Sequence, residues 1–477
     1  MKTYLGPILA IILFTAPLLS VVDTQLPILE GRFGIWQLGE DDNAEDVRDC
    51  GISYVVKQYR WEQIEPEQDL FRFKPLDDWY DDMLEPYDLS GVLIIRTGQS
   101  WATDNSYDST LGKPLHEFAS APPLDYGDYY DYIYNVVYHL KDKIDIFIIE
   151  NEPVTRVAWY GTPEEYILLT SVAYQAAKDA NPSCMVIANK LPAMGFGYLI
   201  ARDLFEQGAF SEAMNFWNGY YSRRDERFQV SRMSELVNWL NSDFGLWVAN
   251  FVDVIMTSEQ AENLDAIGFN YYLHYDYIEQ VVGWIRSKME ENGFYRPLLD
   301  LEHGVKDERS VVSDSTASEE LVKGYVIVQS LGIRYISWYP FTLDSTSHNF
   351  EYLKPMHDYS TDDFFPCYYA MNTIADHFDY YHFFHGKDES FYSRYSFENL
   401  RTGLVDLDII WSDSLDTTVT LPFPKTFNCA IVTDHLGSAV DSLYNLNETL
   451  EIQVGAAPKF IQYKRVTIPP HHDPDSF

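Results

Sequence analysis

The feature that most constrains the fold is the alternation of short apolar segments with helix-forming segments between about residues 30 and 385. Segments with helical spacing, such as Tyr166–Ala180 and Glu319–Leu331, separate the apolar ones. This alternation predicts an α/β fold with a parallel sheet covered by helices, and eight strands are the number that closes a (β/α)8 TIM barrel. The eight predicted strands are Gly31–Leu38, Ile52–Gln58, Gly91–Arg96, Ile144–Glu150, Cys184–Asn189, Leu264–Asn270, Pro297–Glu302 and Ile333–Trp338.

The texture of the sequence changes after about residue 386. Short β-rich segments, separated by Asp, Asn, Ser and Gly, predict an antiparallel β-sandwich over residues 386–466, behind a barrel over residues 28–385. The expected strands are Tyr392–Phe397, Leu404–Trp411, Thr417–Leu421, Cys429–Thr433, Leu450–Val454 and Phe460–Lys464. The Pro- and His-rich tail at 467–477 is expected to be disordered. The stretch Lys190–Asn263 is long for one connection, and we expect helices and an active-site loop region there.

The N-terminus has the composition of a signal peptide. A single early positive charge, Lys2, precedes the apolar stretch Leu5–Val22. Residues 1–22 are therefore a signal peptide or, if uncut, an N-terminal anchor. No later segment has eighteen apolar residues in a row. We expect a secreted or extracytoplasmic protein that touches a membrane only through an uncleaved N-terminal segment.

The charge of the chain excludes several classes of partner. A net charge of −39 argues against nucleic acid and against an anionic membrane surface. It also disfavours a polyanionic substrate unless a local basic site overrides it. The 36 Tyr and 11 Trp suit the apolar faces of sugar rings, although an aromatic-rich core is the alternative explanation.

Four cysteines are scattered along the chain, at Cys50, Cys184, Cys367 and Cys429. They show no C-x-x-C spacing, so a zinc site is not expected. Cys50 and Cys184 flank predicted strands and are expected to be buried thiols, while export would permit disulfides among the four.

Two glutamates stand at the ends of predicted strands. Glu152 follows the apolar run that begins at Ile146, within Asn151-Glu152-Pro153, and Glu302 closes the run that begins at Pro297. Parallel barrels place their chemistry at the carboxyl ends of the strands, so the two carboxylates are expected to meet there. A pair of carboxyl groups acting on one bond is what glycoside hydrolysis requires.

These motifs resemble the clan of retaining glycoside hydrolases built on (β/α)8 barrels, clan A, and are nearest to its β-glucosidase-like families. Asn151-Glu152-Pro153 is similar to the clan's fourth strand end and Glu302-His303-Gly304 to its seventh. Three further segments match in order along residues 30–345: Arg60–Pro66 with Phe71–Phe73 and Leu76-Asp77, Asp265–Tyr272, and Ile336–Pro340. The sandwich also resembles an accessory domain of several clan families.

The resemblance implies roles for individual residues. Glu152 would be the general acid and then the base, with a raised pKa, and Glu302 the nucleophile. Asn151 would bind the sugar 2-hydroxyl, Tyr272 would hold Glu302, and Trp338 would stack on the ring. The alternative for Tyr272 and Trp338 is core packing, and for the two glutamates a structural role such as a strand-end ion pair.

Two positions depart from the clan pattern. Where the clan carries an Arg that steadies the nucleophile, near the end of the second strand, this chain has Lys57 and Arg60. Where the β-glucosidase family carries a His after the third strand, it has Arg96–Trp101. Gln99 and Trp101 are then the candidates to line the pocket.

Together these features predict an exported retaining glycosidase for β-linked, neutral sugars, acting on a glycoside or an oligo- or polysaccharide. The double displacement needs no metal and no cofactor. Two alternatives use the same residues or the same fold: a non-catalytic glycan-binding or cell-surface barrel protein, and a transglycosylase. The sugar, the linkage and the choice between internal and chain-end cleavage do not follow from the sequence.

Overall fold

Eight parallel strands form a closed barrel in the computed structural model of the chain. The structure describes residues 32–36, 44–98, 100–103, 120–156, 158–343, 352–378, 380–388, 391–413, 416–444 and 448–466. The strands are β1 (Phe33–Trp36), β2 (Tyr54–Arg60), β3 (Ser90–Arg96), β4 (Ile146–Ile149), β5 (Met185–Leu191), β6 (Ala266–Tyr271), β7 (Leu298–His303) and β8 (Ile336–Trp338). Each pairs with its neighbours in sequence and β8 closes on β1, so the predicted barrel is confirmed.

Alternating side chains divide the barrel strands into an inner and an outer face. The inner cluster fills the barrel, so it is a packed core and not a channel. Its buried members are Trp36, Tyr54, Val56, Val92, Ile94, Ile146, Ile148, Met185, Ile187, Ala266, Leu299, Leu301 and Tyr335. The outer faces belong to a larger cluster that also takes in the surrounding helices.

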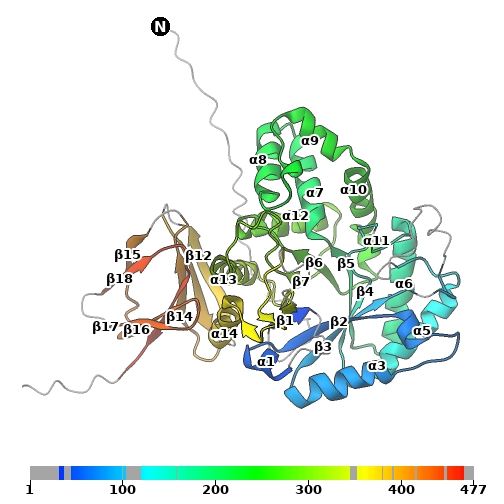
Figure 1. The fold of residues 1–477 in the computed structure, drawn as a ribbon, viewed down its shortest axis with the longest axis horizontal. Helices are drawn as coiled ribbons and strands as arrows, with labels where there is room; N and C mark the ends of the chain where they lie inside the picture. Colours follow the sequence, from blue (N-terminus) through cyan, green and yellow to red (C-terminus); the bar gives the residue numbers. More distant parts are fainter. Residues whose placement is uncertain are drawn as a thin grey trace, which may run out of the picture.

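Helices cover the barrel on its outside (Figure 1). The main ones are α1 (Ala44–Asp49), α5 (Tyr126–Leu140), α6 (Pro163–Ala180), α12 (Ile278–Glu291), α13 (Asp314–Ser330) and α14 (Pro366–Phe378), with short turns α2 (Trp61–Ile64) and α3 (Lys74–Asp77) before a π-helix, η1 (Asp78–Leu84). The start of α6 follows capping rules: Thr162 and Glu165 bond each other's backbone N–H groups, and Pro163 takes the first turn.

The long connection between β5 and β6 consists of helices, as expected. It contains α7 (Ala193–Glu206), α8 (Phe210–Tyr220), α9 (Met233–Leu240), α10 (Asp243–Ile255) and α11 (Ser258–Ala261). The first four pack on one another and rise from one side of the barrel, at the top of Figure 1. The loop that leads from α8 toward α9 carries Arg224, which reaches the site described below.

The C-terminal part is an antiparallel β-sandwich, in agreement with the prediction. One sheet has the order β12-β13-β14-β19-β16-β17 and the other pairs β15 with β18. The strands are β12 (Tyr381–Asp388), β13 (Ser393–Asn399), β14 (Leu404–Trp411), β15 (Thr417–Pro422), β16 (Cys429–Asp434), β17 (Ala439–Tyr444), β18 (Thr449–Val454) and β19 (Lys459–Lys464). The sequence analysis missed β12 and β17, and because β12 begins at Tyr381 the sandwich starts before residue 386.

The sandwich packs directly against the barrel through α13 and α14 (Figure 1). Phe378 of α14 and Phe397 of β13 meet with ring centroids 4.7 Å apart. Asp413, after β14, accepts hydrogen bonds from Lys323 Nζ (2.6 Å) and from the Tyr275 hydroxyl (2.7 Å). Apolar packing and a partly buried ion pair thus fix the two parts as one continuous core.

All four cysteines are buried free thiols, including Cys50 and Cys184, for which burial was expected. Within the described ranges, no cluster of three or more His, Cys, Asp or Glu side chains is arranged to hold a metal ion. None of the helices in these ranges is both long and apolar enough to cross a membrane. The predicted leader at 1–22 and the tail at 467–477 lie outside the described residues.

Candidate active site

Glu152 and Glu302 face each other at the carboxyl end of the barrel. The Nδ2 atom of Asn270, on β6, donates to Glu152 Oε1 at 2.6 Å and to Glu302 Oε2 at 3.0 Å. Because these two distances add to 5.6 Å, the two carboxylate oxygens cannot lie farther apart than that. Retaining glycosidases hold their carboxyl groups about 5–5.5 Å apart, and inverting ones about 6.5–9.5 Å.

The backbone at the ends of β4 and β5 has a conformation that is rare for residues with side chains. Glu150, Glu152 and Asn189 have φ values of 62°, 49° and 54°, in the left-handed region. Each such residue costs on the order of 1 kcal/mol or more, and such residues cluster at functional sites. The turn after β4 thereby presents Glu152 toward β6 and β7 instead of continuing the strand.

Glu302 is almost fully buried and is surrounded by donors. The hydroxyl of Tyr272 donates to Oε1, as the resemblance implied. Lys190 Nζ and Asn270 Nδ2 both donate to Oε2, at 2.8 Å and 3.0 Å. A carboxylate that accepts from an ammonium, an amide and a phenol is stabilised in its charged form, which is the form a nucleophile needs.

Lys190 is the cation of the site, and it comes from β5 rather than from β2. Its side chain is fully buried and forms an ion pair with Glu302. The same ammonium donates to Asn151 Oδ1 at 2.6 Å, so it connects the residues after β4 with β7. This bond takes up the amide oxygen of Asn151 and leaves its Nδ2 as the donor that would reach a sugar hydroxyl.

Glu152 has the electrostatic environment of a general acid. Burial and the negative charge of Glu302 raise its pKa to about 7, against the opposing influence of Lys190 and the Asn270 hydrogen bond. A carboxyl group with this pKa holds a proton through much of the neutral range and can still release it. A raised pKa on one member of a carboxyl pair is the arrangement expected of the member that serves as the acid.

The pair opens into a pocket of about 290 Å³. Its walls are the residues Thr155, Pro192, Ala193, Met194, Arg224, Tyr272, Leu273, Lys306, Tyr339 and Leu353, with both glutamates at its base. Gly304 keeps two of these walls in place, because a Cβ there would lie 2.5 Å from Tyr339 O and 3.1 Å from the Tyr272 ring. A cavity of this size, near the lower end of the usual range for ligand pockets, suits a small ring-shaped ligand.

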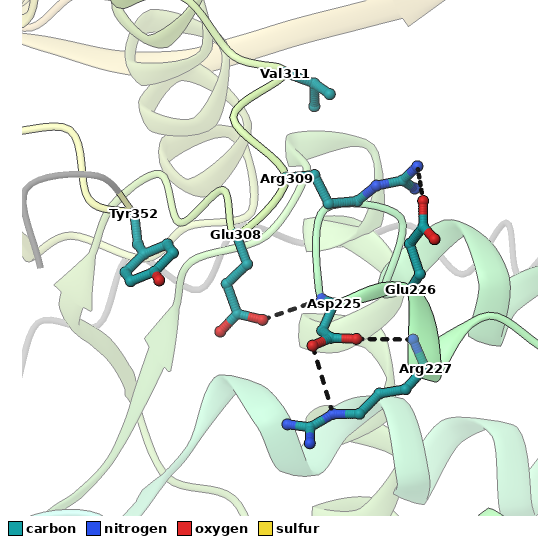
Figure 2. Close-up of a pocket in the computed structure, with 7 residues that line it drawn as sticks. All are labelled: Asp225, Glu226, Arg227, Glu308, Arg309, Val311 and Tyr352. Atoms are coloured by element: carbon teal, nitrogen blue, oxygen red, sulfur yellow. Dashed lines mark hydrogen bonds and ion pairs between the residues drawn. The ribbon is translucent and has the colours of Figure 1, made fainter. Parts of the chain in front are cut away.

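A wider, polar pocket of about 720 Å³ adjoins the first (Figure 2). It is lined by Asp225, Glu226, Arg227, Glu308, Arg309, Val311 and Tyr352. The two pockets share a wall, because Arg224 of the catalytic pocket forms an ion pair with Glu308 of the wide one at 2.9 Å. Figure 2 shows that the arginines of the wide pocket each have an acidic partner, Arg309 with Glu226 and Arg227 with Asp225.

The structure corrects the role expected for Trp338. Its side chain is fully buried among the outer cluster, beside Tyr325 and His303, and its Nε1 donates to Lys354 O at 3.3 Å. The physical reason is strand alternation, since Ser337 of β8 bonds the inward-facing Tyr54 and Tyr339, directly after β8, packs against the inner cluster. Tyr339, not Trp338, is the aromatic side chain from this strand end at the pocket wall.

Three other sequence candidates, Lys57, Arg60 and Trp101, are not among the residues that line this pocket. Lys57 shares the outer face of β2 with Val55 and Tyr59, away from Glu302. Arg60 forms an ion pair with Glu62 at 2.7 Å. Trp101 packs edge-on against Trp61 and donates to Glu65 O at 3.3 Å, outside the pocket lining. Gln99 lies outside the described residues.

Glu150, two residues before Glu152, has a structural role as the partner of a cation. Its buried carboxylate accepts from Arg96 Nε at 3.4 Å and from Thr97 N at 2.7 Å. The ion pair joins β3 to the end of β4 below Glu152. It stabilises the turn that carries Glu152 and does not line the pocket.

Sequence reasoning missed Lys190, Asn270, Tyr339, Arg224 and Lys306. Lys190 directly follows the predicted fifth strand, and Asn270 ends the predicted sixth strand, so the strand-end rule could have identified both. Tyr339 was overlooked in favour of its neighbour. For Arg224 and Lys306, which lie on long loops, the sequence carried no signal.

No protein-family model matches the sequence, and no curated protein sequence matches it. Solved structures match in fold. A family 39 glycoside hydrolase from Bacteroides cellulosilyticus WH2 superposes with a TM-score of 0.64 at 14% identity, over 92% of this chain and 82% of that one. A monomeric β-xylosidase from Caulobacter crescentus CB15 gives 0.60 at 12% identity, over 92% and 96%. A family 30 endoxylanase from Clostridium papyrosolvens C71 gives 0.56 at 12% identity, over 91% and 96%.

At such low identity these matches establish a shared fold and not a shared activity. Each match spans more than nine-tenths of this chain. The neighbours come from more than one glycoside hydrolase family, as the motifs also suggested. The predicted resemblance to (β/α)8-barrel glycoside hydrolases is therefore confirmed at the level of fold, without a single family standing out.

Proposed function

We propose that the chain is a retaining glycoside hydrolase that cleaves β-linked O-glycosides, with Glu302 as nucleophile and Glu152 as acid and base. The observation that carries the proposal is the shared donor Asn270, which limits the separation of two carboxylate oxygens to 5.6 Å. That limit agrees with the spacing of about 5–5.5 Å in retaining enzymes and is shorter than the spacing of about 6.5–9.5 Å in inverting ones. The glycoside hydrolases among the structural neighbours support the same reaction class.

The residues divide the reaction between them. In the first step Glu302 attacks the anomeric carbon, the bond to the leaving oxygen breaks, and the proton of Glu152 moves to that oxygen. In the second step Glu152 takes a proton from water, the water oxygen bonds to the anomeric carbon, and Glu302 is released. Tyr272 and Lys190 hold the Glu302 carboxylate in position for the attack, and Asn151 would bind the 2-hydroxyl.

The stereochemistry of the product tests the proposal most directly. We expect that hydrolysis of a β-glycoside, followed by proton NMR within the first minutes, gives the β-anomer before mutarotation sets in. The reason is that two displacements at one carbon restore its configuration. Initial appearance of the α-anomer would contradict the assignment of Glu302 as nucleophile and make it a base.

The raised pKa of Glu152 predicts the basic limb of the pH profile. Its proton is needed for departure of the leaving group and is lost as the pH rises through about 7. We therefore expect kcat/KM to fall above about pH 7, measured with a glycoside of a poor leaving group. A dinitrophenyl glycoside serves as the control, because its leaving group needs no proton and the same limb should be weak or absent.

Two alternatives remain distinguishable by experiment. A non-catalytic glycan-binding protein would bind glycans and release no product from any glycoside. A transglycosylase would form the same glycosyl-enzyme but pass the sugar to an added acceptor faster than to water. We also propose export through residues 1–22, which a comparison of the N-termini of secreted and intracellular material would test.

A further inference from the structure

The cations around the catalytic pocket are not all neutralised by protein carboxylates. Three basic side chains surround the two glutamates: Lys190, Arg224 and Lys306. Lys190 forms an ion pair with Glu302 and Arg224 with Glu308. Lys306 lines the pocket, and none of the described residues forms a hydrogen bond or ion pair with its ammonium group. Among the described residues, the three basic side chains thus form two ion pairs, and Lys306 takes part in neither.

The surplus is largest in the catalytically competent state. When Glu152 holds its proton, Glu302 is balanced by Lys190 and Glu308 by Arg224, so the charge of Lys306 stands alone. Burial and the nearby Arg224 lower the pKa of Lys306, against the opposing negative charges of Glu308, Glu152 and Glu302. In a chain with a net charge of −39, a half-buried lysine without an ion pair to a described residue is unexpected, unless its ammonium group binds a ligand.

A second polar group of the pocket also lacks a hydrogen-bond partner among the described residues. Arg224 Nη1 is engaged by Glu308, but its Nε is buried and makes no hydrogen bond with any described residue. Lys306 is held firmly, because its backbone N–H donates to Tyr272 O at 2.9 Å and it forms a bridge with Leu353. The side chains that carry these two donors line the same pocket as the glutamates.

We propose that Lys306 and the Nε of Arg224 bind an anionic substituent of the substrate sugar, either the carboxylate of a uronic acid or a sulfate ester. This inference rests on the proposed glycosidase function and names its substrate class. It replaces the expectation of neutral sugars, which followed from the overall charge and allowed for a local basic site. The wide pocket of Figure 2 offers no such site, since its arginines Arg227 and Arg309 are paired with acids.

Matched substrates test the proposal. Nitrophenyl β-glucoside and β-glucuronide differ only in whether the sugar bears a hydroxymethyl group or a carboxylate, and the glucoside 6-sulfate adds the other anion. A nitrophenyl β-galactoside and β-galacturonide make the same comparison for galactose, the epimer of glucose. We expect one of the anionic members to have a kcat/KM at least about 30-fold above its neutral partner, because a buried charge pair contributes that much binding.

The variant Lys306→Met keeps the length of the side chain and removes its charge. It should lower kcat/KM for the preferred anionic substrate by at least about 30-fold more than for the neutral partner. Lys306→Arg should restore much of the loss. Lys74→Met removes an exposed lysine and should alter neither substrate. If Lys306 served only to adjust the pKa of Glu152, the variant would lose activity equally on both substrates, and the basic limb of the pH profile would move.

The outcomes separate this inference from the proposed function. If the wild type cleaves the neutral member of every pair as well as the anionic one, the inference is overturned while the glycosidase assignment stands. If no aryl glycoside is cleaved, calorimetry with free glucuronate, galacturonate, glucose 6-sulfate, glucose and galactose decides. Binding of an anionic sugar that is lost in Lys306→Met supports the inference, and equal or absent binding of the two classes overturns it.

Discussion

Replacing Glu302 by Gln is expected to reduce turnover on the order of 10⁴-fold or more, because the amide cannot form the covalent intermediate. The substitution changes no volume. The Gln oxygen can accept from Lys190 and Asn270, while its amide group faces the Tyr272 hydroxyl, which can rotate to accept. The fold should therefore persist, with a melting temperature lowered by a few degrees for the unpaired Lys190.

The intermediate itself can be captured to check this prediction. An activated 2-deoxy-2-fluoro glycoside of the sugar that the substrate panel identifies should add one sugar mass to the wild type. Peptide mapping should place the label on Glu302, and the Glu302→Gln variant should remain unlabelled. Glu262→Gln is the matched control, an exposed glutamate beside the short helix that precedes β6, at the opposite end of that strand. Labelling of another carboxylate would show that the nucleophile has been misassigned.

The barrel and its two glutamates were predictable because they depend on local patterns. Apolar runs of strand length repeat eight times. A carboxylate that directly follows such a run must lie at the carboxyl end of a parallel barrel. Glu152 and Glu302 needed only that rule. In the sandwich, β14 was found from its partial alternation, whereas β12 and β17 escaped notice because their polar and aromatic residues give no clear period.

The rest of the site depends on which way side chains point at the strand ends, and here local patterns fail. The register shifts between Ala188 and Leu191 in the β5–β6 pair, and between Phe269 and Asn270 in the β6–β7 pair. A shift of one residue turns every following side chain to the other face. The first irregularity adds a residue in β5 just before Lys190, and the second adds one in β7 and pairs Glu302 with Asn270; no periodicity in the sequence marks either.

The position of the cation beside Glu302 could not be predicted from local patterns either. The resemblance placed it on β2, where Lys57 and Arg60 were the candidates. The structure supplies it from β5, three strands away, as Lys190. A buried site needs one positive charge near Glu302 to offset its desolvation, but several strand ends can deliver it. The chemistry of the site thus requires a basic residue near Glu302, and tertiary packing determines which strand provides it.

Replacing Glu152 by Gln is expected to have an effect that depends on the leaving group. For an alkyl or sugar leaving group, the loss of the general acid should lower kcat/KM by about 10²–10⁴-fold. For dinitrophenolate, which departs without a proton, formation of the glycosyl-enzyme should continue at nearly its normal rate. The second step still lacks its base, so the intermediate should accumulate and give a burst of dinitrophenol in stopped-flow measurements.

An added nucleophile that needs no base separates this role from a structural one. Azide should restore turnover of the dinitrophenyl glycoside by Glu152→Gln and yield the β-glycosyl azide, because the intermediate on Glu302 is attacked from the face that Glu152 normally serves. Glu302→Gln forms no intermediate and should gain no β-azide product. An equal loss on all leaving groups, with no response to azide, would contradict the assignment of Glu152. The two glutamates then could not be acting as acid and nucleophile on the same bond.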